Sequence, residues 1–253
     1  MIVIKSEEEI NKLRIAGNIV YKTHQYLKNY IKPGITTKEL NSLAEEFIKN
    51  NDATPSFKNH QGFPASICTS VNEQIVHGIP GDYKLKDGDI ISIDIGACYR
   101  GYHGDSGWTY PVGKISEGKN NLLKLTEEAL YTGLNNIKPG KRIGDISNAI
   151  ETVAKNNNLG IVKELVGHGI GSDVHEDPEI PNYGISGTGP ILEVGMVLAI
   201  EPMLTLGSPN IVVNEDGWTI ESEDYSPSAH FEHTVVVTED GYEILTGELI
   251  ENE

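Results

Sequence analysis

Three acidic residues lie within or beside short apolar runs of this 253-residue chain, where burying a charged side chain is unfavourable. Asp94 interrupts the run 90–95, Glu201 follows the run 196–200, and Glu232 lies just before a third. A buried carboxylate costs several kcal/mol unless a cation pairs with it. The chain has 20 Lys and Arg against 37 Asp and Glu, and none of those cations lies in these runs. A site that holds more than one metal cation is the simplest common explanation.

Another aspartate and several histidines extend this set. Asp105 lies eleven residues after Asp94, and a turn at 98–101 would let a β-hairpin bring the two carboxylates side by side. His168 lies in the stretch Val-Gly-His-Gly-Ile-Gly, where flanking glycines let the backbone open and the imidazole reach inward. His175 follows seven residues later, and the triplet His-Gly-Ile also occurs at His77.

Each of these residues alone is more often a turn, loop or strand-edge residue than a ligand. Together they offer four carboxylates and one to three imidazoles, which favours Mn²⁺, Fe²⁺, Co²⁺ or Zn²⁺. Four carboxylates would over-neutralise one divalent ion, whereas two ions roughly 3.5–4 Å apart would balance the charge. His24 is interpreted as structural or exposed, and four further histidines near the candidate segments stay open: His60, His103, His230 and His233.

The elements that must position these residues come in two copies. The tetrapeptide Ile-Lys-Pro-Gly at 31–34 recurs at 137–140, and an amphipathic helix is predicted after each copy. A capping box of Ser6 and Glu9 predicts a helix before the first copy, and Ser116 opens its counterpart. The repeat predicts two halves, each with two helices and a sheet, related by a pseudo-two-fold axis. A site between the halves would draw ligands from both.

The bulk composition is that of one globular domain, which we expect to span 1–253 with halves at about 1–115 and 116–253. No apolar run approaches the roughly 20 residues of a membrane helix, and the acidic N-terminus is unlike a signal peptide, so we expect a cytoplasmic protein. Its net charge of −17 argues against nucleic acid or an acidic membrane as a partner. Its two cysteines build neither a disulfide framework nor a four-cysteine zinc site.

The order of these residues resembles that of the type I methionine aminopeptidases, and the likeness runs over nearly the whole chain. It is carried by the five candidate ligands and by local motifs: Cys68-Thr69-Ser70-Val71-Asn72-Glu73, Ile93-Asp94-Ile95-Gly96, His103-Gly104-Asp105, Gly167-His168-Gly169-Ile170-Gly171, Ile200-Glu201-Pro202-Met203, Asp216-Gly217-Trp218-Thr219 and Phe231-Glu232-His233-Thr234. The resemblance implies an α+β "pita-bread" fold, with a central antiparallel sheet and two helix pairs from the internal repeat.

The resemblance also implies an activity: removal of N-terminal methionine from nascent peptides and proteins with a small second residue, through a bridging hydroxide of a dinuclear metal site. The implied partners are Met-peptides and nascent chains near the ribosome, and the implied state is a monomer. The implied metal ligands are Asp94, Asp105, His168, Glu201 and Glu232, of which Asp105 and Glu232 would bridge two divalent ions.

Roles for residues around the metals follow from the same resemblance. His77 and His175 would contact the substrate and its developing oxyanion, and Glu201 is the candidate proton shuttle. The methionine pocket would be lined by Cys68, Phe63 and Trp218.

The chain departs from the family at positions beside this pocket. His60 and Gln61 stand where the family often has Tyr and His, and Val174 stands where an aromatic residue is common. The metal set is complete. The departures therefore bear on the shape of the methionine pocket and on which second residues are tolerated.

Three alternatives stay open at this point. One is the same fold with X-Pro peptidase or creatinase-like specificity, although those enzymes carry a large N-terminal domain. Another is a binding module that has lost its metals, although all five ligand positions are filled here. The third is a two-metal phosphoesterase, although no Gly-rich phosphate loop lies next to a Lys or Arg.

Overall fold

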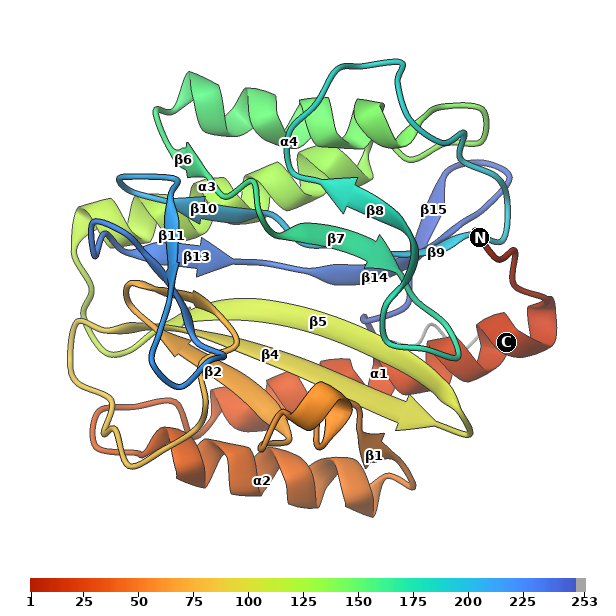
Figure 1. Ribbon diagram of the computed structural model, residues 1–253. Helices are drawn as coiled ribbons and strands as arrows, with labels where there is room; N and C mark the ends of the chain where they lie inside the picture. Colours follow the sequence, from red (N-terminus) through yellow and green to blue (C-terminus); the bar gives the residue numbers. More distant parts are fainter. Residues whose placement is uncertain (249–253) are drawn as a thin grey trace.

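Two helix pairs enclose a set of antiparallel strands in the computed structural model, which describes residues 1–248. Residues 249–253 of the expected domain lie outside the described part. One pair is α1 (Glu7–Lys28) and α2 (Thr37–Asn50), and the other is α3 (Glu117–Leu134) and α4 (Ile143–Asn156). Figure 1 shows the two pairs on opposite outer sides of the strands.

Side-chain caps fix the starts of α1, α2 and α3, and those at Ser6 and Ser116 are the ones that the sequence predicts. Ser6 and Glu9 form a capping box at α1, and Thr36 forms another at α2. Ser116 accepts a hydrogen bond from the backbone of Lys119 at the start of α3. Because each cap satisfies backbone N–H groups that have no partner inside the helix, it sets where the helix begins. The repeated Ile-Lys-Pro-Gly lies between the two helices of each pair, which confirms the repeat as a structural one.

The strands pair only antiparallel within residues 1–248, and their ladders divide into four sheets rather than one continuous sheet. The sheet against α1 and α2 contains β1 (Thr54–Pro55), β2 (Ile67–Val71), β4 (Ile90–Tyr99) and β5 (Tyr102–Pro111). The five-stranded sheet contains β7 (Val166–Gly169), β8 (Glu176–Pro181), β9 (Val197–Ile200), β14 (His233–Val237) and β15 (Tyr242–Ile244).

Two small sheets and a short 3₁₀ turn complete the layers. One small sheet contains β3 (Gln74–Val76), β11 (Ile211–Val213) and β12 (Ile220–Ser222). The other contains β6 (Gly160–Ile161), β10 (Met203–Thr205) and β13 (Ser228–His230), and the 3₁₀ turn η1 is His60–Gly62.

Apolar side chains fill the space between each helix pair and the adjacent strands. The interface of α3 and α4 with the strands buries residues such as Leu130, Ile146 and Leu198. The interface of α1 and α2 buries residues such as Leu27 and Leu40. Polar strand residues therefore collect on the faces turned away from the helices, between the two halves. Among residues 1–248, no helix combines the length and the apolar content that a membrane span requires.

Candidate metal centre and active site

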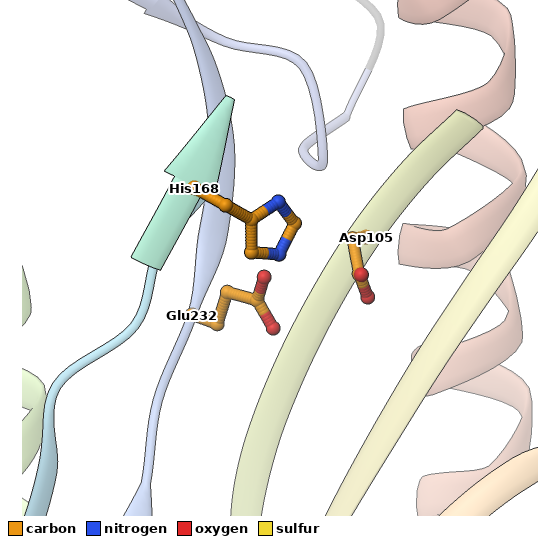
Figure 2. A group of neighbouring side chains, drawn as sticks. All are labelled: Asp105, His168 and Glu232. Carbon is orange, nitrogen blue, oxygen red and sulfur yellow. The ribbon is translucent and has the colours of Figure 1, made fainter. Parts of the chain in front are cut away.

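Three side chains from three separate strand segments converge between the two halves. Asp105 lies on β5, His168 on β7, and Glu232 in the break between β13 and β14. One potential ligand atom of each lies within 4.8 Å of the others. Figure 2 shows the His168 imidazole and the Glu232 carboxylate turned toward one another, with Asp105 facing them from β5. This convergence is the geometry of a metal site.

The other two predicted ligands border the same cluster. The hairpin of β4 and β5 turns at Arg100 and Gly101, both with positive φ, as in a two-residue type I′ turn. Its register places Asp105 opposite Gly96, so Asp94 lies two positions away on the same face. The structure thus narrows the turn predicted at 98–101 to two residues.

Glu201 reaches the cluster from the end of β9, which stops at Ile200 before Pro202. Its Oε1 atom lies 3.4 Å from Nε2 of His168. Proline has no backbone N–H and cannot extend the ladder, so the strand ends where the carboxylate is needed. All five predicted ligands line one cavity.

His168 presents a defined nitrogen to this cavity. Its Nδ1 lies 2.9 Å from the carbonyl oxygen of Gly169, which can only accept, so Nδ1 carries the proton. Burial lowers the pKa of His168 to about 4, which keeps the imidazole neutral. Nε2 therefore has a free lone pair, as a metal-ligating histidine requires.

The glycines around His168 are required by the close approach of neighbouring strands, whereas the sequence predicted that they open the backbone. A Cβ atom at Gly167 would lie 2.4 Å from the carbonyl oxygen of Ala199 on β9. A Cβ atom at Gly169 would lie 2.1 Å from the carbonyl oxygen of Asp177 on β8. Neighbouring backbones thus approach β7 too closely for any side chain at these positions. The two glycines fix His168 by close strand packing.

The acidic groups are buried without the partners that carboxylates need. Asp105 and Glu232 are 4% and 2% exposed. Asp94 Oδ1, Asp105 Oδ1 and Glu232 Oε1 are buried without a hydrogen-bond partner in the described residues. Burial raises the pKa of Asp94 to about 7 and raises those of Asp105, Glu201 and Glu232, with neighbouring carboxylates adding to the last three. Oxygen-rich donors with one neutral imidazole fit divalent cations of the Mn²⁺ to Zn²⁺ series.

These raised pKa values predict that metal affinity depends on pH. Below its raised pKa of about 7, the Asp94 carboxyl holds a proton that an incoming ion must displace, and above it the carboxylate is free. We therefore expect Mn²⁺ affinity to fall about tenfold per pH unit for each proton displaced as the pH drops through this value. Titration calorimetry at about pH 6 and about pH 8, in buffers of different ionisation enthalpy, measures affinity and proton release together. Equal affinity at both pH values without proton release would contradict the prediction.

A hydrogen-bonded frame holds the ligand-bearing segments together. The backbone N–H of Glu232 donates to the carbonyl oxygen of Gly107 at 2.7 Å, and the Ser106 hydroxyl donates to the carbonyl oxygen of Glu232 at 2.7 Å. The Thr234 hydroxyl donates to the carbonyl oxygen of Asp105 at 2.7 Å and accepts from its N–H at 3.1 Å. These contacts join β5 to β14 and to the segment just before it.

The cavity has a volume of about 440 Å³ and an apolar end. Phe63 packs edge-on against Trp218, with ring centroids 5.2 Å apart. Cys68 lies in the same apolar cluster, and burial raises the pKa of its thiol, with the charge of Asp94 adding to the effect. Cys68 is thus a neutral, weakly polar lining group. The cluster also contains Phe57, Ala65 and Val174.

Two predicted substrate-contacting histidines line the same cavity. His77 follows β3 with φ of 58°, and burial lowers its pKa to about 4. His175 precedes β8, with its ring 4.5 Å from that of His168, and burial also lowers its pKa. Both imidazoles are therefore neutral near pH 7, so each can donate one hydrogen bond and accept another.

The sequence did not decide whether four further histidines belong to the site, and the structure places them at different locations. His60 lines the cavity, and His230 lies 3.7 Å from both Glu201 and Glu232 through Nε2. His103 bonds Ser56 through Nδ1. His233 lies with the buried His24 at a separate cavity of about 970 Å³, which contains none of the five candidate ligands.

The position of His230 could not be read from strand alternation. Alternation predicts one continuous strand with His230, Glu232 and Thr234 on one face. The structure instead ends β13 at His230 and starts β14 at His233, because the two strands pair with β10 and β9 of different sheets. The only signal in the sequence was its two-residue spacing from Glu232.

Comparison with known proteins agrees with this site. A family model described as metallopeptidase family M24 matches residues 11–239. Methionine aminopeptidase 1 of Bacillus subtilis is 56% identical over 97% of this chain and 99% of its own length. The crystal structure of a methionine aminopeptidase from Thermotoga maritima superposes with a TM-score of 0.97 at 44% identity, over 98% of this chain and all of that one.

The comparisons also include the X-Pro peptidase branch. A prolidase from Pyrococcus furiosus superposes with a TM-score of 0.77 at 25% identity and is covered over 66% of its length.

The high identity to methionine aminopeptidases and the close superposition on one of their crystal structures confirm the resemblance and the pita-bread fold expected from it. The family model matches most of the chain, its relatives are similar over nearly their full length, and candidate metal ligands converge in one cavity. The chain therefore belongs to metallopeptidase family M24.

Proposed function

We propose that this chain is a methionyl aminopeptidase, a metal-dependent hydrolase that removes N-terminal methionine when the second residue is small. The observation that carries the proposal is a single cavity of about 440 Å³ in which five candidate metal ligands adjoin a pocket of apolar and aromatic side chains. The curated relatives named methionine aminopeptidase support the substrate.

The metal set is proposed to hold two divalent ions. Their ligands would be Asp94, Asp105, His168, Glu201 and Glu232, with Asp105 and Glu232 shared between the ions. The buried carboxylate oxygens without partners support this set. When bound, such ions polarise a carbonyl group and provide a nucleophile at neutral pH. Co²⁺, Mn²⁺, Fe²⁺ and Zn²⁺ all suit the donor atoms.

The protein groups would then divide the remaining work. The apolar end, with Phe63, Cys68 and Trp218, accepts the flexible methionine side chain. The neutral imidazoles of His77 and His175 donate hydrogen bonds to the carbonyl oxygen of the methionine residue, where negative charge develops. Glu201 takes up on a carboxylate oxygen the proton that the attacking water loses, and delivers it to the nitrogen of the departing peptide as the C–N bond breaks.

We further propose that the chain works as one catalytic domain, because its candidate ligands come from both halves of the repeat. The proposed substrates are Met-peptides and nascent chains, which are made in the cytoplasm, and we place the enzyme there, near the ribosome. We propose a monomer, since one chain supplies every group of the site.

A peptide panel tests this function. Purified protein is stripped of metal and assayed with and without Mn²⁺ on Met-Ala-Ser, Met-Leu-Ser and Ala-Pro peptides. We expect Mn²⁺-dependent release of methionine from Met-Ala-Ser, much slower release from Met-Leu-Ser, and no cleavage of Ala-Pro. Preferred cleavage of Ala-Pro would instead indicate an X-Pro peptidase. A protein that binds less than one equivalent of Mn²⁺ and cleaves none of them would be a binding module.

A further inference from the structure

One imidazole in the cavity has no role in the scheme above. His60 lines the cavity, and its Nε2 atom is buried without a hydrogen-bond partner in the described residues. Its ring centroid lies 5.4 Å from that of His175, which lies 4.5 Å from that of His168. The ring of His175 thus contacts both the candidate metal ligand His168 and His60. An unpaired buried polar atom destabilises a fold unless a ligand satisfies it.

A strained turn holds His60 in this place. Asn59 and Gln61, on either side of it, have φ of 67° and 49°, in the left-handed region that non-glycine residues rarely adopt. The turn is closed by hydrogen bonds from the N–H of Asn59 to the carbonyl of Phe63 and from the N–H of Phe63 to the carbonyl of His60, at 2.8 and 2.9 Å. Strain of this kind gathers where a side chain must meet a ligand.

The two ends of the cavity determine which part of a substrate lies near His60. The apolar end takes the methionine side chain, and His175 adjoins the candidate ligands where the bond is cleaved. His60 lies next to His175, with the ring centroids 5.4 Å apart. The polar residues Gln61, Glu176, Asp177 and Glu179 line the same cavity. A peptide extending past the cleaved bond would reach this polar wall.

We propose that His60 is a specificity-determining residue that hydrogen-bonds the backbone of the substrate just beyond the cleaved bond. This inference rests on the proposed function. The imidazole Nε2 donates or accepts according to its tautomer, and the second residue offers both a carbonyl oxygen and the N–H that follows it. The contact favours extended peptides over simple methionine amides, which lack both groups.

The test uses two substrates that differ in that backbone. Met-Ala-Ser contains the second carbonyl and the following N–H, whereas methionine isopropylamide has the same cleaved amide and neither group. His60→Phe keeps a ring and removes both nitrogens, and His60→Gln restores a donor and an acceptor. Asn59→Gly is the matched control, because it changes the same turn at an exposed position outside the cavity lining and glycine adopts a positive φ readily. The Mn²⁺ stoichiometry of each variant is measured alongside kcat and KM.

We expect His60→Phe to lower kcat/KM for Met-Ala-Ser about tenfold, the effect of one lost hydrogen bond, and to leave methionine isopropylamide within about twofold. His60→Gln should recover most of the loss, and Asn59→Gly should keep the kcat/KM of the unchanged protein on both substrates. Equal losses on both substrates, no loss on either, or a His60→Gln variant as weak as His60→Phe would each overturn the inference. If the unchanged protein cleaves neither substrate, the proposed function fails instead.

Discussion

Replacing Glu232 with alanine is expected to abolish metal binding and hydrolysis together. Glu232 is 2% exposed and shares a 4.8 Å cluster with Asp105 and His168, so its carboxylate has no substitute at that position. Loss of an outer hydrogen-bond partner of a metal ligand already costs roughly 10–100-fold in affinity, and loss of a ligand itself should exceed that range. Calorimetric titration with Mn²⁺ and the rate of Met-Ala-Ser cleavage measure both effects.

Thermal unfolding separates this effect from simple misfolding. In the metal-free protein the pKa of Glu232 is raised by burial and by the nearby Glu201 and Asp94 carboxylates, so its removal relieves a buried acidic group. We expect metal-free Glu232→Ala to remain folded and to lose the rise in Tm that Mn²⁺ gives the unchanged protein. Glu179→Ala, at an exposed position of the same cavity wall, is the matched control. A Glu232→Ala protein that keeps full Mn²⁺ affinity would remove this residue from the metal site.

Replacing His175 with alanine should separate binding from turnover. Its imidazole lines the cavity beside His168 and contributes none of the three clustered ligand atoms. If it donates a hydrogen bond to the developing oxyanion, its loss should lower kcat by about 10²–10³-fold, with Mn²⁺ affinity within about twofold. Steady-state kinetics on Met-Ala-Ser, together with Mn²⁺ titration, give the two numbers.

A second histidine variant shows whether the effect is specific to this position. His103 lies close by and bonds Ser56, but it is absent from the cavity wall. We expect His103→Ala to keep kcat within about threefold, because it touches no reacting group. Normal turnover in His175→Ala would exclude it from the mechanism, and parallel loss of Mn²⁺ would make it a positioning residue for the metal.

Much of the fold follows from local signals in the sequence. The boxes at Ser6 and Thr36 fix helix starts with groups three residues apart, so short-range chemistry determines them. The apolar runs around Asp94 and Glu201 place both acids in or at the end of strands, as observed. A hairpin with a two-residue turn is enough to bring Asp94 and Asp105 to the same face of the sheet.

The rest depends on contacts that no local pattern encodes. Three-residue strands such as β10 and β13 are paired through long-range packing, which is why an unbroken strand through Glu232, expected from alternation, was wrong. The placement of His60 beside His175 joins residues more than a hundred positions apart through a turn with two positive φ values. Non-glycine residues in that region give no sequence signal, since tertiary packing imposes the conformation.

The hydrogen bonds that join β5 to the segment around Glu232 bear on which metal ion the candidate site binds. Main-chain groups and the hydroxyls of Ser106 and Thr234 hold the strands that carry the candidate ligands, so these bonds use none of the candidate ligand atoms. Oxygen donors discriminate weakly among neighbouring first-row metals when geometry does not enforce a choice. We therefore expect the candidate site to accept more than one ion of this series, with its occupant set by which ion is available.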